Sequence, residues 1–305
     1  MSHDGLRLVP ASSVSLEEYA AAFTSAFRGY QFPIAVDAAW LARRVRIEQH
    51  DLQQSLLAYE GDAVVGVAGL AMRGHAGWVC GFGVMPERRG RGLGREMMAA
   101  LVARARACGL RSLSLEVLTR NTAARRLYEG AGMRVSRDLL MLDRVQPAQT
   151  PDAAADSKQA APAKSKQQAK SKPKRAAPKS EAAPRLKEAT PAELLGHFAR
   201  LHAERPAWQR DLAALLVRRE RGRYLGPRRR PRAYALLSEW DDGSTYLSDL
   251  AAADAAGADE LASALAAIAG TLKVINESEH SLFVGPLLSR GFVETERQHE
   301  MVMDL

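Results

Sequence analysis

Two side chains that could move protons lie close together in the middle of the chain, at Glu116 and Tyr128. Glu116 is flanked by Leu115 and Val117, and Tyr128 follows it by twelve positions, between Leu127 and Glu129. A carboxylate in apolar surroundings can act as a general base, and a phenol with a pKa of ~10 stays protonated at neutral pH and can act as a general acid. Two plainer roles remain open: Glu116 as a strand carboxylate that only helps to bind, and Tyr128 as a packed helical tyrosine.

A glycine- and arginine-rich turn precedes this pair. The apolar segment 78–84 predicts a strand, the turn spans Arg88 to Gly94, and the apolar spacing of residues 95–107 predicts a helix. Glycines allow consecutive backbone N–H groups to point inward, and a helix N-terminus adds partial positive charge. Arginines at 88, 89, 91 and 95 strengthen the attraction for phosphate. The turn is therefore predicted to bind a phosphorylated ligand.

The spacing of this turn excludes two familiar phosphate sites. The Walker A pattern G-x-x-x-x-G-K-[ST] is absent, which argues against a nucleoside triphosphatase. The glycines run Gly90, Gly92, Gly94 and do not form G-x-G-x-x-G, and the turn lies mid-domain, not after a first strand. A dinucleotide-binding fold is therefore not expected, although Glu116 lies about where a ribose-binding acid would.

The order of the motifs indicates a family. Arg89 to Gly94 reads R-x-x-G-x-G, and LEV-x-x-x-N-x-x-A-x-x-LYE-x-x-G follows, with Asn121 as its asparagine. This combination resembles the GNAT superfamily of acetyl-CoA-dependent N-acetyltransferases. The resemblance implies direct attack of a primary amine on acetyl-CoA in a ternary complex, with no metal. The acetyl-CoA-binding residues that it implies are Phe82, Gly83, Val84, Arg89, Gly90, Arg91, Gly92, Leu93, Gly94, Arg95, Asn121 and Tyr128.

The resemblance also assigns roles. It implies that the strand at Phe82 to Val84 is splayed from its neighbour and pairs with the pantetheine arm, with a backbone N–H near Gly83 or Val84 facing the thioester oxygen. It places Tyr128 beside the CoA sulfur as general acid. The LEV and LYE segments look like those of the ribosomal-protein N-terminal acetyltransferases, in which the glutamate matching Glu116 is the general base.

The acceptor is the least specified part of the site. In GNAT domains the first two helices and their connection line the acceptor side, so Tyr30, Phe32 and His75 are the candidate substrate residues. Core packing explains these side chains equally well. The acceptor is expected to be a small-molecule amine or a protein amino group.

Composition divides the chain into three parts. Residues 1–146 contain the motifs, residues 147–184 are rich in Ala, Lys, Pro and Ser, and residues 185–305 form a second folded region. The middle segment has too little apolar surface to offset its ordering entropy, and it is predicted to be a disordered linker. The expected architecture is α/β (α+β), with two GNAT-like domains, each a mixed, mostly antiparallel twisted sheet flanked by helices.

The second domain is predicted to be a degenerate copy of the first. A shift of 159 residues lays 113–133 over 272–292. In this register Ile275 replaces Glu116, His280 replaces Asn121 and Leu287 replaces Tyr128. The segment before a predicted helix at 259–270 has one glycine, no arginine and two carboxylates, which does not suit a pyrophosphate.

The formal charge of +8 would suggest a nucleic-acid partner if it were concentrated on one folded surface. The three parts instead carry +5, +5 and −2. A nucleic-acid partner is therefore unlikely but open, through the linker and the arginine-rich segment 218–232. The alternative function is a non-catalytic acetyl-CoA sensor that binds RNA or another polyanion. Two cysteines and no long apolar run favour a cytoplasmic protein without a membrane partner, and no oligomeric state follows.

Overall fold

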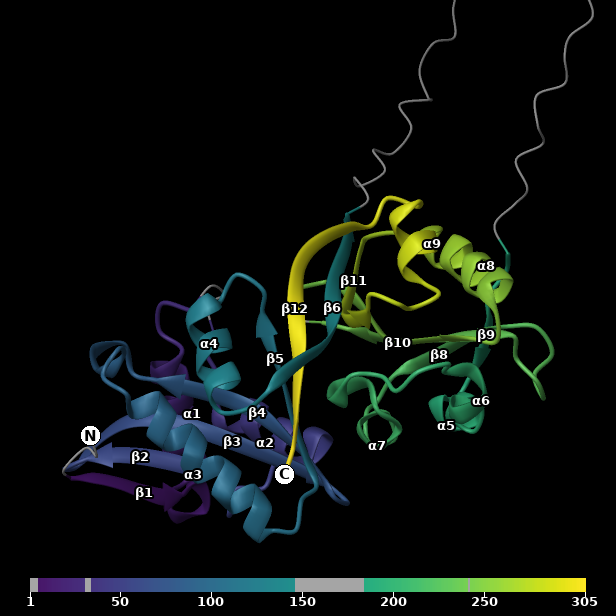
Figure 1. The fold of residues 1–305 in the computed structure, drawn as a ribbon. Helices are drawn as coiled ribbons and strands as arrows, with labels where there is room; N and C mark the ends of the chain where they lie inside the picture. The colour runs from purple at the N-terminus through teal and green to yellow at the C-terminus, as the bar shows by residue number, and fades with distance from the viewer. Residues whose placement is uncertain (1–4, 31–33, 146–183, 241) are drawn as a thin grey trace, which may run out of the picture.

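A computed structural model of the chain describes residues 5–30, 34–145, 184–240 and 242–305 (Figure 1). We call residues 5–145 the first half and residues 184–305 the second half. The elements of the first half are β1 (Leu6–Pro10), α1 (Leu16–Ala26), α2 (Ala38–Glu48), β2 (Leu56–Glu60), β3 (Ala63–Arg73), β4 (Ala76–Val84), α3 (Leu93–Ala107), β5 (Ser112–Leu118), α4 (Thr122–Gly130) and β6 (Arg134–Val145), with short 3₁₀ turns at Ala11–Ser13 and Pro86–Arg88.

Local sequence signals account for the helices that flank the first half's strands. Ser15 accepts a hydrogen bond from the Glu18 backbone while the Glu18 side chain accepts one from Ser15, a capping box that starts α1. Asp37 caps α2 by accepting from the Trp40 N–H at 2.7 Å. Helices α1 and α2 share one apolar cluster with β2 and β3, whereas α3 and α4 pack in a second cluster with β3, β4 and β5. The first-half strands therefore have helices on both faces.

The second half repeats this order with shorter helices. Its elements are β7 (Lys187–Ala189), α5 (Pro191–Leu195), α6 (Phe198–Leu201), the 3₁₀ turn η3 (Trp208–Arg210), α7 (Leu212–Leu215), β8 (Arg221–Leu225), β9 (Ala233–Glu239), β10 (Thr245–Ala252), α8 (Ala255–Ala266), β11 (Thr271–Ser278), α9 (Val284–Leu288) and β12 (Val293–Asp304). Helix α8 begins four residues before the expected helix at 259–270, because Asp254 caps it by accepting from the Gly257 N–H at 2.7 Å.

All of these strands belong to one sheet, in the order β1-β2-β3-β4-β5-β12-β6-β11-β10-β9-β8-β7. Only the β4–β5 and β10–β11 pairs are parallel. The last strand of the chain, β12, is inserted between β5 and β6, so each half receives the terminal strand of the other (Figure 1). The side chains are exchanged as well: Met301 and Met303 pack in the core beneath α3, and Leu140 and Leu142 pack in the core beneath α8.

The strand exchange changes the expected number of sheets and does not test the expected division of function at residue 146. The mixed, mostly antiparallel architecture with flanking helices is confirmed, but the two expected sheets are joined into one. The 159-residue shift carries the bounds of β6 onto those of β12. The functional division at 146 stays a prediction, and the predicted linker, except for Pro184, lies outside the described residues. Among the described helices, none is long and apolar enough to cross a membrane.

Strand exchange predicts that the two halves hold together without a covalent link. We expect a chain with a specific protease site engineered at 160–170 to elute from a size-exclusion column as one species after complete cleavage. The reason is that separation would break both ladders of β12 and expose the buried methionines of that strand. Denaturant should then separate the two pieces. Two smaller native species after cleavage would contradict the exchange.

Candidate active site of the first half

The site begins where β4 leaves β5. The two strands pair only from Ala76 to Trp78, and beyond this point the edge of β4 that faces β5 lacks a ladder partner among the described strands. The pairing of β4 with β3 is interrupted by a bulge at Cys80. Gly81 follows, and a Cβ there would lie 2.4 Å from the Phe23 ring, so only glycine fits. The bulge accompanies the predicted splay, and we call the edge of β4 at 82–84, which has no ladder partner among the described strands, the slot.

The glycine turn meets this slot at the start of α3. Gly90 and Gly92 have φ values of 76° and 94°, a left-handed conformation that side chains other than glycine seldom adopt. Gly92 is the N-cap of α3 and supplies no side-chain cap. Among the described helices of eight or more residues, α1, α2, α4 and α8 each have a side-chain cap. The N-cap therefore offers no side-chain acceptor to the N–H groups of Leu93 and Gly94, which an anion could then bind, whereas the Arg95 N–H donates to the Gly92 carbonyl at 2.9 Å.

Arg89 holds the turn in place from inside the protein. Its guanidinium donates to the carbonyl of Val84 at 2.9 Å, and to those of Ala26 and Arg28 at 3.0 and 3.1 Å. These bonds tie the turn to the end of β4 and to the end of α1. Arg88 forms an ion pair with Glu60, with 2.8 Å between Nε and Oε2. The geometry thus gives Arg89 a part in shaping the cradle through the backbone.

Tyr128 lies on α4 against the other side of the slot. It is buried, with Phe82 of β4 edge-on to it at 6.0 Å between ring centroids. Burial, and next the nearby Tyr30 phenol, raise the pKa of Tyr128, which keeps its hydroxyl protonated at neutral pH. Asn121 caps α4 by accepting from the Ala124 N–H, and it also hydrogen-bonds Tyr30. The structure therefore brings Phe82, Asn121, Tyr128 and Tyr30 together.

Glu116 lies on β5 two residues beyond its last pairing with β4. Its Oε2 accepts hydrogen bonds from Trp78 Nε1 at 2.7 Å and from Gln209 Nε2 at 3.3 Å. Burial raises the pKa of Glu116 to about 7, with Glu300 and Glu48 adding to the effect while the two donors oppose it. A carboxylate with this pKa is half ionised at neutral pH, where it can both accept and release a proton.

One candidate residue lies apart from the others, one lies outside the described residues, and one contact was not expected. His75 lies in the turn before β4, nine residues or about 30 Å of extended chain from Val84, so the structure does not bring these two residues together. It interacts instead with the Gly109 carbonyl at 3.1 Å. Phe32 lies outside the described residues. The sequence analysis missed Gln209, because its contact with Glu116 spans 93 positions and no motif marks it.

A buried thiol nearby does not form a nucleophilic site. Cys80 and His50 are both buried, and each would contact a Cβ placed on Gly69. Burial raises the pKa of the Cys80 thiol, and burial lowers the pKa of His50 to about 3. Both groups are therefore neutral at pH 7, whereas a reactive pair needs a thiolate. No cluster of three or more potential metal ligands occurs among the described residues.

Comparison with known proteins identifies the family. Residues 16–133 match the profile of the Acetyltransferase (GNAT) family. This part of the chain is a GNAT acetyltransferase domain. A curated relative, "Uncharacterized N-acetyltransferase YycN" of Bacillus subtilis, is 43% identical over 53 residues, which are 17% of this chain and about a third (34%) of that protein.

Solved structures extend the likeness to both halves. A GCN5-related N-acetyltransferase from Sphaerobacter thermophilus has a TM-score of 0.64 and 14% identity, with 100% of this chain and 97% of that chain covered. A tandem GNAT protein from the clavulanic acid biosynthesis pathway has a TM-score of 0.62 and 15% identity, with 98% of each chain covered. At this identity the likeness shows the fold, which is that of tandem GNAT proteins.

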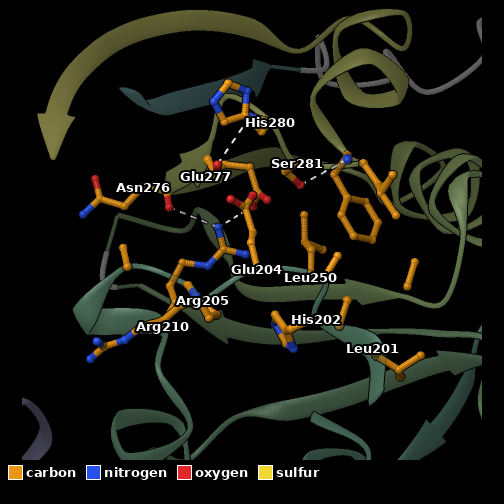
Figure 2. Close-up of a pocket in the computed structure, with 18 of the residues that line it drawn as sticks. Leu201, His202, Glu204, Arg205, Arg210, Leu250, Asn276, Glu277, His280 and Ser281 are labelled. Atoms are coloured by element: carbon orange, nitrogen blue, oxygen red, sulfur yellow. Dashed lines mark hydrogen bonds and ion pairs between the residues drawn. The ribbon is translucent and has the colours of Figure 1, made fainter. Parts of the chain in front are cut away.

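The second half retains the splayed strands of a GNAT domain but not its anion cradle. Strands β10 and β11 pair in parallel only at Thr245 and Tyr246, and a cavity of about 270 Å³ opens beyond them (Figure 2). Asp254 accepts from an N–H of the first turn of α8, where the GNAT domain has Gly92. A carboxylate of the chain already accepts at this helix start, as a phosphate would in the first half, and the absence of CoA binding from this half stays a prediction.

Most of the arginine-rich segment 218–232 is paired within the protein. The pairs are Arg218–Glu220, Arg221–Glu239, Arg223–Glu188, Arg228–Glu193 and Arg232–Glu260. These acids reduce the positive charge that the segment presents to a polyanion. A face neutralised by neighbouring acids therefore accounts for most of the segment, and a nucleic-acid partner stays a prediction.

The contacts of Arg89 predict a stability effect. Replacing Arg89 with alanine should lower the free energy of unfolding by about 1 to 2 kcal/mol, because it removes three bonds to carbonyls that anchor the turn. Arg106→Ala, at an exposed position near the end of α3, is the matched control and should change stability little. Urea titration measures both. Equal values for the two variants would contradict the anchoring role.

The raised pKa of Glu116 predicts pH-dependent stability. The Glu116 carboxyl keeps its proton to about pH 7 in the folded state but loses it near pH 4.5 in the unfolded state. The free energy of unfolding therefore falls between pH 4.5 and pH 7, and the loss is complete above pH 7 and absent below pH 4.5. Glu116→Gln, which can still accept from Trp78, should stabilise the protein above pH 7 by about 2 to 3 kcal/mol and change it little at pH 4. Thermal unfolding across this pH range tests the sign, which reverses if Glu116 has a depressed pKa.

Proposed function

We propose that the GNAT domain is an acetyl-CoA-dependent N-acetyltransferase that acts on a primary amine of a small molecule or of a protein. The observations that support the proposal are the uncapped start of α3, the edge of β4 beyond Trp78 that has no ladder partner among the described strands, and Tyr128 packed against Phe82 of β4. Glu116 lies on β5, the strand from which β4 diverges. Acetyl-CoA fits this arrangement as donor. The N–H groups at the start of α3 would bind its pyrophosphate, and the open edge of β4 at 82–84 would pair with its pantetheine amides.

The residues around the slot suit both proton transfers of amine acetylation. Glu116, half ionised near pH 7, takes a proton from the acceptor ammonium, directly or through water, and leaves the neutral amine that attacks the thioester carbonyl. A backbone N–H near Gly83 or Val84 donates to the oxygen that gains negative charge. The carbon–sulfur bond then breaks, and Tyr128, still protonated, donates its proton to the departing thiolate. The nitrogen of the new amide releases its extra proton, which returns to the Tyr128 oxygen directly or through water and restores the neutral phenol.

The proposal predicts the pH dependence of turnover. Because Glu116 must be ionised, kcat/KM should rise tenfold per pH unit below about pH 7 and level off above it. Its alkaline limb, set by Tyr128, should lie above the ordinary range for a phenol. The measurement is CoA-thiol release with a panel of amines, peptide N-termini and polyamines. A rate independent of pH between 5.5 and 8 would contradict Glu116 as the base.

Two substitutions separate the base from the acid. Glu116→Gln should lower kcat by about 10²- to 10³-fold and should abolish the acid limb, which is the rise of kcat/KM with pH below about pH 7. Tyr128→Phe should lower kcat about 10²-fold and leave this acid limb in place. Glu129→Gln is the control, since Glu129 adjoins Tyr128 but makes only a half-exposed ion pair with Arg125. If Glu129→Gln is impaired as strongly as Glu116→Gln, the assignment is wrong.

A further inference from the structure

The second half inserts one 3₁₀ turn, η3, into the acceptor side of the GNAT domain. Trp208 is buried and stacks on Trp78, with 5.9 Å between ring centroids and 16° between planes. Its indole N–H donates to the Glu48 carbonyl at 2.9 Å, and Arg73 both covers its ring and donates to its carbonyl at 2.7 Å. Trp78 is also the residue that donates to Glu116. The turn is therefore anchored beside the residue that holds the proposed base.

The next residue of this turn reaches Glu116. The Gln209 side chain donates from Nε2 to Glu116 Oε2 at 3.3 Å, while its Oε1 accepts from Asn276 Nδ2 at 3.2 Å. Arg218 donates to the Gln209 backbone carbonyl at 3.1 Å. Because Asn276 presents a donor, the oxygen of the Gln209 amide must face it, and the NH₂ group must then face Glu116. Asn276 thus fixes the orientation of the amide.

We propose that Gln209 is a positioning residue of the acetyl-transfer site, and that the second half acts through it as a working part of that site. The inference rests on the proposed function of Glu116 as general base. It goes beyond a degenerate copy that only supports the fold. The Gln209 amide fixes the direction of one carboxylate oxygen and stabilises the ionised form, which is the form that accepts a proton from the acceptor amine.

Other titratable groups lie near Glu116. They are Glu300 on β12, which pairs with Arg137; Glu48 at the end of α2, which pairs with Arg44; and the neutral thiol of Cys80 on β4. The carboxylates disfavour ionisation of Glu116, and Trp78 and Gln209 favour it. Removing the Gln209 donor should therefore shift the Glu116 pKa upward, and the ionised fraction at neutral pH should fall.

Asn276, which donates to Gln209, also lines the cavity of the second half. Asn276 and Arg210 border the 270 Å³ cavity, and in Figure 2 Arg210 reaches toward the Asn276 carbonyl and Glu277. Asn276 has a φ of 57°, which glycine also tolerates. Asn276→Gly would therefore free the Gln209 amide without backbone strain and should give a smaller shift in the same direction as loss of Gln209.

The test is a ¹³C NMR titration of glutamate carboxyl groups in the full-length protein, with the Glu116 signal assigned by its absence in Glu116→Gln. The wild-type signal should titrate near pH 7, and Gln209→Leu, close in size but without a donor, should move the midpoint upward by about one pH unit. Gln209→Glu, which adds a negative charge, should move it further. Gln53→Ala, an exposed glutamine bonded to Ser12, is the control and should not shift it.

An unchanged Glu116 midpoint in Gln209→Leu with native thermal stability overturns the proposal. If Gln209→Leu does not fold, an unchanged midpoint in both Gln209→Glu and Asn276→Gly overturns it. The titration needs no turnover, so it separates this inference from the proposed function. A Gln209-dependent midpoint without acetylation of any amine would refute only the function. An active enzyme whose acid limb does not follow Gln209 would refute only the positioning role.

Discussion

The insertion of β12 between β5 and β6 is the constraint on which the rest of the structure depends. Its backbone pairs with β5 on one side and with β6 on the other, so the centre of the sheet contains strands from both halves. This register places Glu300 directly across from Glu116. The core of each half contains side chains from the terminal strand of the other, so each half buries apolar surface that the other supplies.

The same joined sheet brings the second half to Glu116. The turn that follows α6 lies at the junction of the two halves, where Trp208 stacks on Trp78 and Gln209 donates to Glu116. The first half contains the unpaired edge of β4 and the helix start without a side-chain cap, and the second half adds a buried tryptophan and a hydrogen-bond donor to Glu116.

Local chemistry was predictable from the sequence, and long-range pairing was not. The caps at Ser15 and Asp37 follow from neighbouring residues, and the structure has both. The splay at Phe82 to Val84 was implied by the family resemblance, and the structure ends the β4–β5 pairing at Trp78. The 159-residue repeat was also readable, but a repeat makes β6 and β12 interchangeable in pattern. Nothing in the pattern tells which half each strand completes, because both present similar alternating faces.

The site shows the same division. Glu116 and Tyr128 were recognisable because a motif marks them, whereas Gln209 belongs to no motif and is positioned only by the exchanged sheet. His75 and Val84 lie at opposite ends of β4, and a titratable residue near a predicted strand says nothing about which end of that strand it occupies. The direction of β4, fixed by its parallel pairing with β5, decides the question.

The most direct test of this account is calorimetric titration of acetyl-CoA into the full-length chain and into Gly92→Val. Valine cannot readily adopt the φ of 94° at this N-cap, so the cradle should be lost while the remainder of the fold is kept. We predict one acetyl-CoA per wild-type chain and no binding to the variant. Two sites per chain, or binding unaffected by Gly92→Val in a folded protein, would contradict a single cradle at the start of α3.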